Sequence, residues 1–200
     1  MKQSGYKTWG YDNMKSIGSN TVQPIRDKEK IEDMKNYLKR KSPRDHFLFH
    51  MGINIGIRIS DLINLKVGDV KGKRFTYVKE QKTDNKKKIK INASLRESIE
   101  DYISMMELAD EDYLFPSRMK GKHISRVQAW RILNEAAAHV GLEEIGTHSL
   151  RKTFGYHYYQ KTKDVAMLQE IFGHSAPSIT LRYIGINEQM IDESLEDFSL

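Results

Sequence analysis

Apolar residues recur every three or four positions along most of the chain, which is typical of helices with one buried face. In "RDKEKIEDMKNYLKRK", residues 26–41, Ile31, Met34 and Leu38 fall on one side of a predicted amphipathic helix. The pattern predicts further helices at 42–56, 60–65, 95–108, 124–141, from 148 onward, at 164–173 and at 177–183. Most of the chain is therefore expected to be helical.

Residues that begin and end helices flank several of these segments. Ser42 before Pro43 suits a helix start, and Gly56 and Gly173 suit helix ends. Ser94 followed by a glutamate three residues later predicts a capping box for the helix at 95–108. These boundaries make the helical segments separate elements joined by short loops.

Two segments depart from the helical period. We predict strands for "RFTYVKEQ" and "KKKIKIN", joined by the turn "KTDN", as a hairpin with basic residues on its exposed face. The expected fold class is therefore α+β, mainly α-helical with one small antiparallel β-sheet. Residues 1–25 show no clear period and contain Gly5, Gly10 and Gly18, so we expect a flexible lead-in.

The composition limits the class of protein. The 200 residues are 38% hydrophobic, enough for one good core, and no apolar run approaches the roughly 20 residues of a membrane span. The chain has no cysteine, which excludes disulfides and thiolate metal sites and agrees with a reducing cytoplasm. A net charge of +6 and a pI of about 9.3 favour a polyanionic partner.

The charge is unevenly distributed. A block from 71 to 90 has nine basic residues: Lys71, Lys73, Arg74, Lys79, Lys82, Lys86, Lys87, Lys88 and Lys90. Of these, Lys79, Lys86, Lys87 and Lys88 of the hairpin are the candidates for binding the phosphate backbone of a nucleic acid. The tail after Asn187 has five acidic residues and no basic one, so two surfaces with different partners are expected.

Two arginines are candidates for holding a phosphate. His148 and Arg151 lie three residues apart in "GTHSLRKTFGYH", hence on one side of a helix whose N-terminus would favour an anion. Such a pair also arises often by chance. Arg58 lies between Ile57 and Ile59, where an arginine needs an anion. Either it forms a buried ion pair with Asp61, or Asp61 orients Arg58 while the guanidinium holds a phosphate oxygen.

A tyrosine is the candidate nucleophile. In "GHSAPSITLRYIG", Tyr183 follows His174 by nine residues. A phenol with a pKa near 10 attacks a phosphate only if a base takes its proton and cations offset the developing charge. Lys82 lies in the predicted hairpin turn, and one of the hairpin lysines could reach from this projecting loop into a cleft as a proton donor; the composition does not say which one.

Three segments, "GIRISDLINL", "HSLRKTF" and "FGHSAPSITLRYI", in this order, closely resemble the tyrosine recombinases of the phage integrase family. "YLFPS" at 113–117 and the lysine-bearing hairpin are similar to that family as well. The resemblance covers roughly residues 25–185. It implies a catalytic site of Arg58, Lys82, His148, Arg151, His174 and the nucleophile Tyr183, with Asp61 in support; Lys79 or Lys86 remain alternatives for the hairpin lysine.

The resemblance also implies a division of the chain and an activity. Residues 26–186 would form the catalytic domain and 187–200 an acidic helical tail, with no separate N-terminal core-binding domain. The chain would then be either a minimal recombinase or a catalytic fragment. The resemblance implies DNA strand exchange through a 3′-phosphotyrosyl intermediate, without metal, nucleotide or other cofactor. It also implies a tetramer that assembles on DNA, and a gene carried by a bacterium, a phage or a mobile element.

The chain departs from the family pattern at two positions, and its tail allows two arrangements. Lys152 replaces a histidine common after the second arginine in the family, a change expected to be peripheral, and Asp61 is shorter than the frequent glutamate. The tail, with Ile191, Leu195 and Phe198 at helical spacing, would dock either on its own domain or on a neighbouring protomer.

Other functions fit parts of the pattern. The same chemistry would serve relaxation of supercoils, as in type IB topoisomerases, and a domain that had lost turnover would serve as a DNA-binding regulator. A metal pair at His46 and His50 is conceivable, but "HFLFH" is more typical of a packed helix.

Overall fold

The computed structural model describes residues 22–79, 86–186, 193, 195–196 and 198–199. Its helices are α1 (Lys28–Lys41), α2 (Pro43–Ile55), α3 (Ile59–Ile63), α4 (Ala93–Met106), α5 (Arg126–His139), α6 (Thr147–Thr162), α7 (Val165–Phe172) and α8 (Pro177–Tyr183), with a 3₁₀ turn η2 (Val67–Asp69). Strands β1 (Phe75–Lys79) and β2 (Lys86–Lys90) form one antiparallel sheet. The predicted fold class is confirmed.

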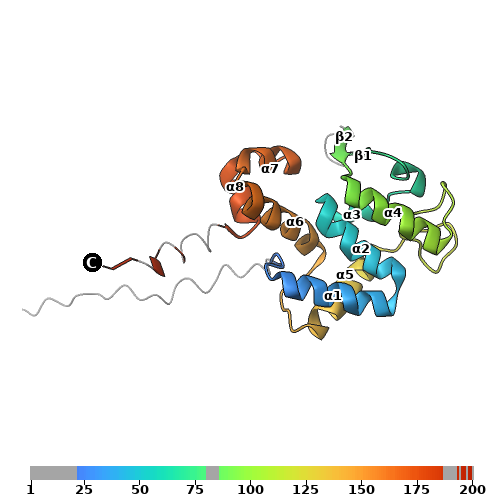
Figure 1. The fold of residues 1–200 in the computed structure, drawn as a ribbon, viewed down its shortest axis with the longest axis horizontal. Helices are drawn as coiled ribbons and strands as arrows, with labels where there is room; N and C mark the ends of the chain where they lie inside the picture. Colours follow the sequence, from blue (N-terminus) through green and yellow to red (C-terminus); the bar gives the residue numbers. More distant parts are fainter. Residues whose placement is uncertain (1–21, 80–85, 187–192, 194, 197, 200) are drawn as a thin grey trace, which may run out of the picture.

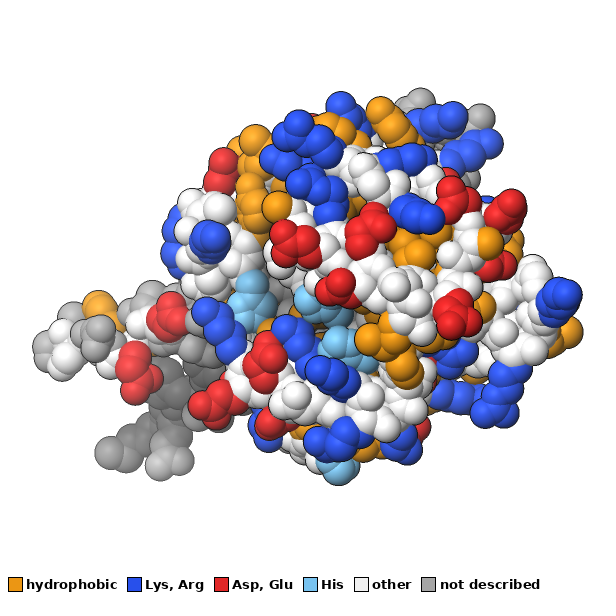
Figure 2. Space-filling view, turned by 45° about the vertical axis from the view of Figure 1, so that its right-hand side comes forward, with side chains coloured by type: hydrophobic (Ala, Val, Ile, Leu, Met, Phe, Trp, Pro, Cys, Tyr) orange, Lys and Arg blue, Asp and Glu red, His pale blue; other side chains and the backbone are white. Residues whose placement is uncertain are grey.

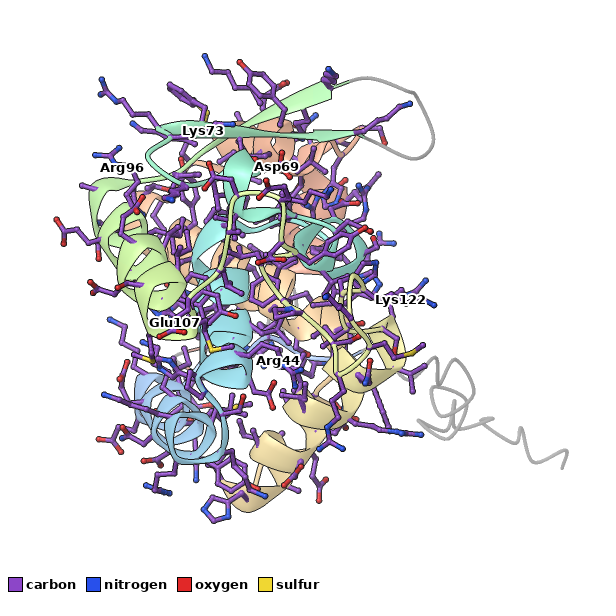
Figure 3. All side chains as sticks on the ribbon, turned by 90° about the vertical axis from the view of Figure 1, so that its right-hand side faces the viewer. Arg44, Asp69, Lys73, Arg96, Glu107 and Lys122 are labelled. Atoms are coloured by element: carbon purple, nitrogen blue, oxygen red, sulfur yellow. The ribbon has the colours of Figure 1, made fainter. Side chains whose placement is uncertain are left out.

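Helix α2 lies at the centre of the arrangement, with α1, α4 and α6 packed around it (Figure 1). It is apolar on most sides, and Phe47, Leu48, Phe49 and Met51 are buried in the main core. At its start, Arg44, labelled in Figure 3, pairs with Asp45 and donates from Nη1 to a backbone carbonyl of the 113–117 segment. Because α2 is buried on most sides, its C-terminal end is held in place, and with it the turn that carries Arg58.

Most helix boundaries follow the residues that predict them. The Ser42 side chain caps α2 through the Asp45 N–H, and Gly56 ends α2 with a positive φ of 67°. Helix α4 is different: Asn92, not Ser94, is its N-cap and accepts from the Leu95 N–H at 2.8 Å. The predicted Ser94 capping box is wrong because an asparagine two residues earlier already satisfies that helix end.

A second, smaller core holds the last helices together. Tyr156, Leu168, Phe172, Ile184 and Ile186 pack where α6, α7 and α8 meet. Gly155 allows this approach, because a Cβ there would lie 2.7 Å from both Ile184 and Phe172. Helix α8, which ends in Tyr183, is thus held against α6.

The packed part of the chain begins earlier than the predicted boundary at residue 25. Ile25 is 2% exposed, and its N–H donates to Thr153 Oγ1 at 2.9 Å. The Gln23 N–H donates to the Glu144 carbonyl. Residues 22–25 therefore lie against α6 and do not belong to a flexible lead-in; residues 1–21 lie outside the described part.

The hairpin separates its lysines onto two faces. Lys86, Lys88 and Lys90 are exposed on one face of β2, whereas Lys87 and Ile89 are half-buried on the other. Lysine and arginine side chains gather along the upper edge of the view in Figure 2, where the hairpin lies. The turn at 80–85, which includes Lys82, lies outside the described residues.

The described residues of the C-terminal tail are exposed. Leu195 and Phe198 are 61% and 66% exposed, and Ile191 lies outside the described residues. In the part of the chain that the structure describes, no helix is both long and apolar enough to span a membrane.

Candidate active site

Arg151 is the centre of the site. It lies on α6 with only 7% of its surface exposed, and its two terminal nitrogens donate to the carbonyls of Gly56 and Phe172, both at 2.8 Å. Its guanidinium carbon lies 4.3 Å from the centroid of the Phe172 ring. Arginine has five N–H donors, so a guanidinium fixed by two carbonyls and a ring still has donors for a phosphate.

The turn after α2 places one of those carbonyls. Gly56 adopts a left-handed conformation, and a Cβ on it would lie 2.4 Å from Phe154 Cδ1. Only glycine accepts both the backbone angle and this close approach without strain. The turn that positions the Gly56 carbonyl for Arg151 leads directly into Arg58, so it positions both arginines.

Tyr183 lies at the end of α8 and faces these groups. Its ring contacts the His174 ring edge-on, with centroids 5.2 Å apart, and the Phe172 ring at 5.5 Å. Burial raises the pKa of Tyr183, while the charges of Arg151 and Arg58 and a hydrogen bond with Arg151 oppose that rise. Tyr183 is thus half-buried, the charges of both arginines act on it, and it is not enclosed in an apolar interior.

Both histidines of the site have a lowered pKa, and burial is the first cause for each. His174 Nδ1 lies 3.0 Å from Thr180 Oγ1, and burial, followed by the charge of Arg151, lowers its pKa. His148 is in the first turn of α6, where burial is again the first cause of a lowered pKa and nearby cations add to it. At neutral pH both rings are therefore mostly uncharged and able to accept a proton.

Arg58 is exposed at the N-cap of α3, so a buried Arg58–Asp61 ion pair is wrong. The side chain instead borders a small pocket that Ile57, Arg58, Asp61, Val78, Lys87, Ile89 and Arg151 line. Its charge acts on Arg151, Tyr183 and both histidines. Five of the six predicted catalytic residues thus come together from segments far apart in the sequence, and Lys82 lies outside the described residues.

Lys87 belongs to this site more closely than the sequence indicates. It lines the same pocket, its Nζ donates to the Glu170 carbonyl at 3.0 Å, and its charge contributes to the lowered pKa of His174. The sequence suggests only a general DNA contact. Side chains alternate between the two faces of β2, so Lys87 lies on the same face as Ile89, and Lys86 and Lys88 lie on the other. This alternation is the sequence signal that could have distinguished Lys87 from the other hairpin lysines.

The alternative pair, His46 and His50, lies elsewhere, on α2. The two rings stack with centroids 6.2 Å apart and line a pocket with Phe47 and Tyr102. Burial lowers the pKa of both histidines. Residues of α4 line the same pocket, and among the described residues the two histidines belong to no group of three or more His, Cys, Asp or Glu that could hold a metal ion.

Comparison with known proteins agrees with this geometry. The sequence pattern of the Phage integrase family matches residues 26–190. The chain belongs to this family. A relative in Bacillus subtilis (strain 168), "Probable integrase/recombinase YoeC", is 57% identical over 167 residues, which make up 84% of this chain and 91% of that protein.

More distant relatives are longer. "Tyrosine recombinase XerA" of Pyrococcus furiosus is 29% identical over 175 residues, 86% of this chain but 60% of its own length. Among solved structures, XerH bound to a palindromic difH substrate, a post-cleavage complex, matches with a TM-score of 0.71 and 22% identity over 92% of this chain and 55% of that one. The chain spans about half to 60% of the length of the similar curated relatives other than YoeC.

Proposed function

We propose that this tyrosine recombinase family protein cleaves and rejoins DNA strands at specific sites. The observation that carries the proposal is the placement of Tyr183 beside the buried Arg151: the Phe172 ring contacts both side chains, and the charges of Arg151 and Arg58 act to lower the Tyr183 pKa. A phenol placed beside two phosphate-binding cations is arranged for attack on a phosphodiester. Solved structures of similar fold include the Tn1549 transposon integrase in complex with transposon right end DNA and XerH bound to a difH substrate, which supports DNA as the partner.

The proposed chemistry is a transesterification. The Tyr183 oxygen forms a bond to phosphorus while the bond to the 5′-oxygen breaks, giving a 3′-phosphotyrosyl link and a free 5′-hydroxyl. His148 takes the phenol proton, and Lys82 supplies a proton to the leaving oxygen. Arg58 and Arg151 bind the non-bridging oxygens, and His174 donates a hydrogen bond to the phosphate.

The proposal extends to assembly. Attack of the freed hydroxyl on the link of a partner duplex exchanges strands, so we propose a tetramer on two duplexes in the cytoplasm. The described tail residues Leu195 and Phe198 are exposed, which supports docking of residues 187–200 on a neighbouring protomer. Residues 26–186 would form the catalytic domain.

A duplex with a nick just beyond the cleavage site tests the function, because the short cleaved fragment diffuses away and the adduct accumulates. We expect wild type to form a covalent protein–DNA adduct and Tyr183→Phe to form none, since phenylalanine lacks the attacking oxygen. Tyr159→Phe on α6 is the matched control and should form adduct as wild type does. An adduct with Tyr183→Phe would contradict the assignment. Relaxation of any plasmid without a preferred site would favour the topoisomerase alternative.

The hairpin lysines can be separated with a substrate whose 5′-bridging oxygen is sulfur, a leaving atom that needs no protonation. Lys82→Met is expected to slow cleavage of the oxygen substrate about 10²-fold or more and to regain wild-type rates with sulfur. Lys87→Met should slow both substrates alike, because we assign Lys87 to binding. Restoration by sulfur in the Lys87 variant alone would instead make Lys87 the proton donor. Single-turnover rates of adduct formation give the comparison.

A further inference from the structure

Lys152 is a buried cation beside the nucleophile. It is 8% exposed on α6, immediately after Arg151, and its Nζ lies 5.3 Å from the centroid of the Tyr183 ring. The sequence suggests that this replacement of a common histidine is peripheral. Burying an ammonium is unfavourable unless its surroundings compensate, and the face of an aromatic ring is one such surrounding.

We infer that Lys152 is a positioning residue for the strand-cleaving tyrosine, holding the Tyr183 ring by its face; the inference rests on the proposed role of Tyr183. Phe172 and His174 meet that ring at steep interplanar angles of 77° and 71°. Lys152 adds a cation over the ring, which the two aromatic contacts do not supply.

The contact strengthens during the reaction. As the phenol loses its proton, the ring gains negative charge, and its attraction to a cation over its face increases. A contact that is stronger in the transition state than in the ground state accelerates the step. Lys152 therefore favours the form of Tyr183 that attacks, without competing with Arg151 for the hydroxyl.

A second effect reaches His148, four residues earlier on the same face of α6. After burial, the charge of Lys152 is the largest cause of the lowered pKa of His148. The other cations that act on this ring are Arg151 from α6, Arg126 from α5 and Arg58 from the turn before α3. Lys152 thus holds the proposed base in its neutral, proton-accepting form.

The first test compares variants on the nicked duplex. Lys152→Met removes the charge at similar size and should slow adduct formation about 10-fold or more, whereas Lys152→Arg, which keeps a cation, should restore part of the rate. Lys161→Met removes a lysine from an exposed position on the same helix and should leave the rate unchanged. If Lys152→Met does not fold, Lys152→Gln takes its place, since it keeps a polar end.

The second test is a pH titration. His148 is neutral above its pKa, so adduct formation should fall on the acid side, and loss of Lys152 should raise the pKa and move that fall to higher pH. NMR titration of the His148 ring in the free protein should show the same upward shift for Lys152→Met and none for Lys161→Met. A Lys152→Met variant with the wild-type rate and pH profile would overturn the inference. Absence of adduct in the wild type itself would instead contradict the proposed function, and the NMR titration would still decide the effect on His148.

Discussion

Replacing Arg151 by glutamine is expected to slow strand cleavage by about 10³-fold or more, measured as single-turnover adduct formation at saturating protein. The arginine charge stabilises the developing negative charge on the attacked phosphate, and loss of a positioned cation has an effect of this size in phosphoryl transfer. The variant also loses the donors for the Gly56 and Phe172 carbonyls, which costs about 1–3 kcal/mol of folding stability for each one left unsatisfied. The cleavage rates are therefore compared well below the Tm of the variant, so that the loss reports the missing cation and not unfolding.

Arg96→Gln is the matched control. Arg96 also donates to a backbone carbonyl, that of Ile91, but from α4, where Figure 3 shows it at the edge of the molecule. Its cleavage rate should be that of the wild type. Arg151→Lys should remain strongly impaired, because one ammonium cannot span two carbonyls and also present a planar pair of donors. Cleavage by Arg151→Gln within about 10-fold of wild type would contradict the proposed role.

The sequence predicts the elements of this fold well for a physical reason. Local residues determine where its helices begin and end: Ser42 and Gly56 bound α2, and Gly173 ends α7. Where two cap residues compete, as Asn92 and Ser94 do before α4, the local pattern does not decide between them. The prediction of Arg58, His148, Arg151, His174 and Tyr183 as site residues rested on the resemblance of three ordered segments to the phage integrase family.

What the sequence does not predict depends on partners distant along the chain. Arg151 is fixed by a carbonyl 95 residues away and another 21 residues away, and a carbonyl carries no side-chain signal. The two isoleucines that flank Arg58 suggest that it is buried. Its side chain is nevertheless exposed, because Arg58 is the N-cap residue of α3, where the backbone turns. The contact of Lys152 with the Tyr183 ring likewise exists only once α6 and α8 have packed together.

Replacing Gly56 by alanine is expected to impair both stability and cleavage. An alanine with a φ of 67° costs about 1–2 kcal/mol, and a methyl group 2.4 Å from Phe154 Cδ1 adds about 1–3 kcal/mol of overpacking. The free energy of unfolding should fall by about 2–5 kcal/mol, which lowers Tm by at least 4 °C. Relief of the clash also displaces the Gly56 carbonyl from Arg151, so cleavage well below Tm should fall at least about 10-fold.

Gly72→Ala separates the two causes. Gly72 has nearly the same φ, 66°, but nothing lies within 4 Å of a Cβ built there. This control carries the backbone strain without the clash, so it should lose about 1–2 kcal/mol of stability and cleave DNA at the wild-type rate. Thermal unfolding and adduct formation are measured on both variants. Equal losses of cleavage in Gly56→Ala and Gly72→Ala would mean that the rigid turn after α2 does not position Arg151 for catalysis.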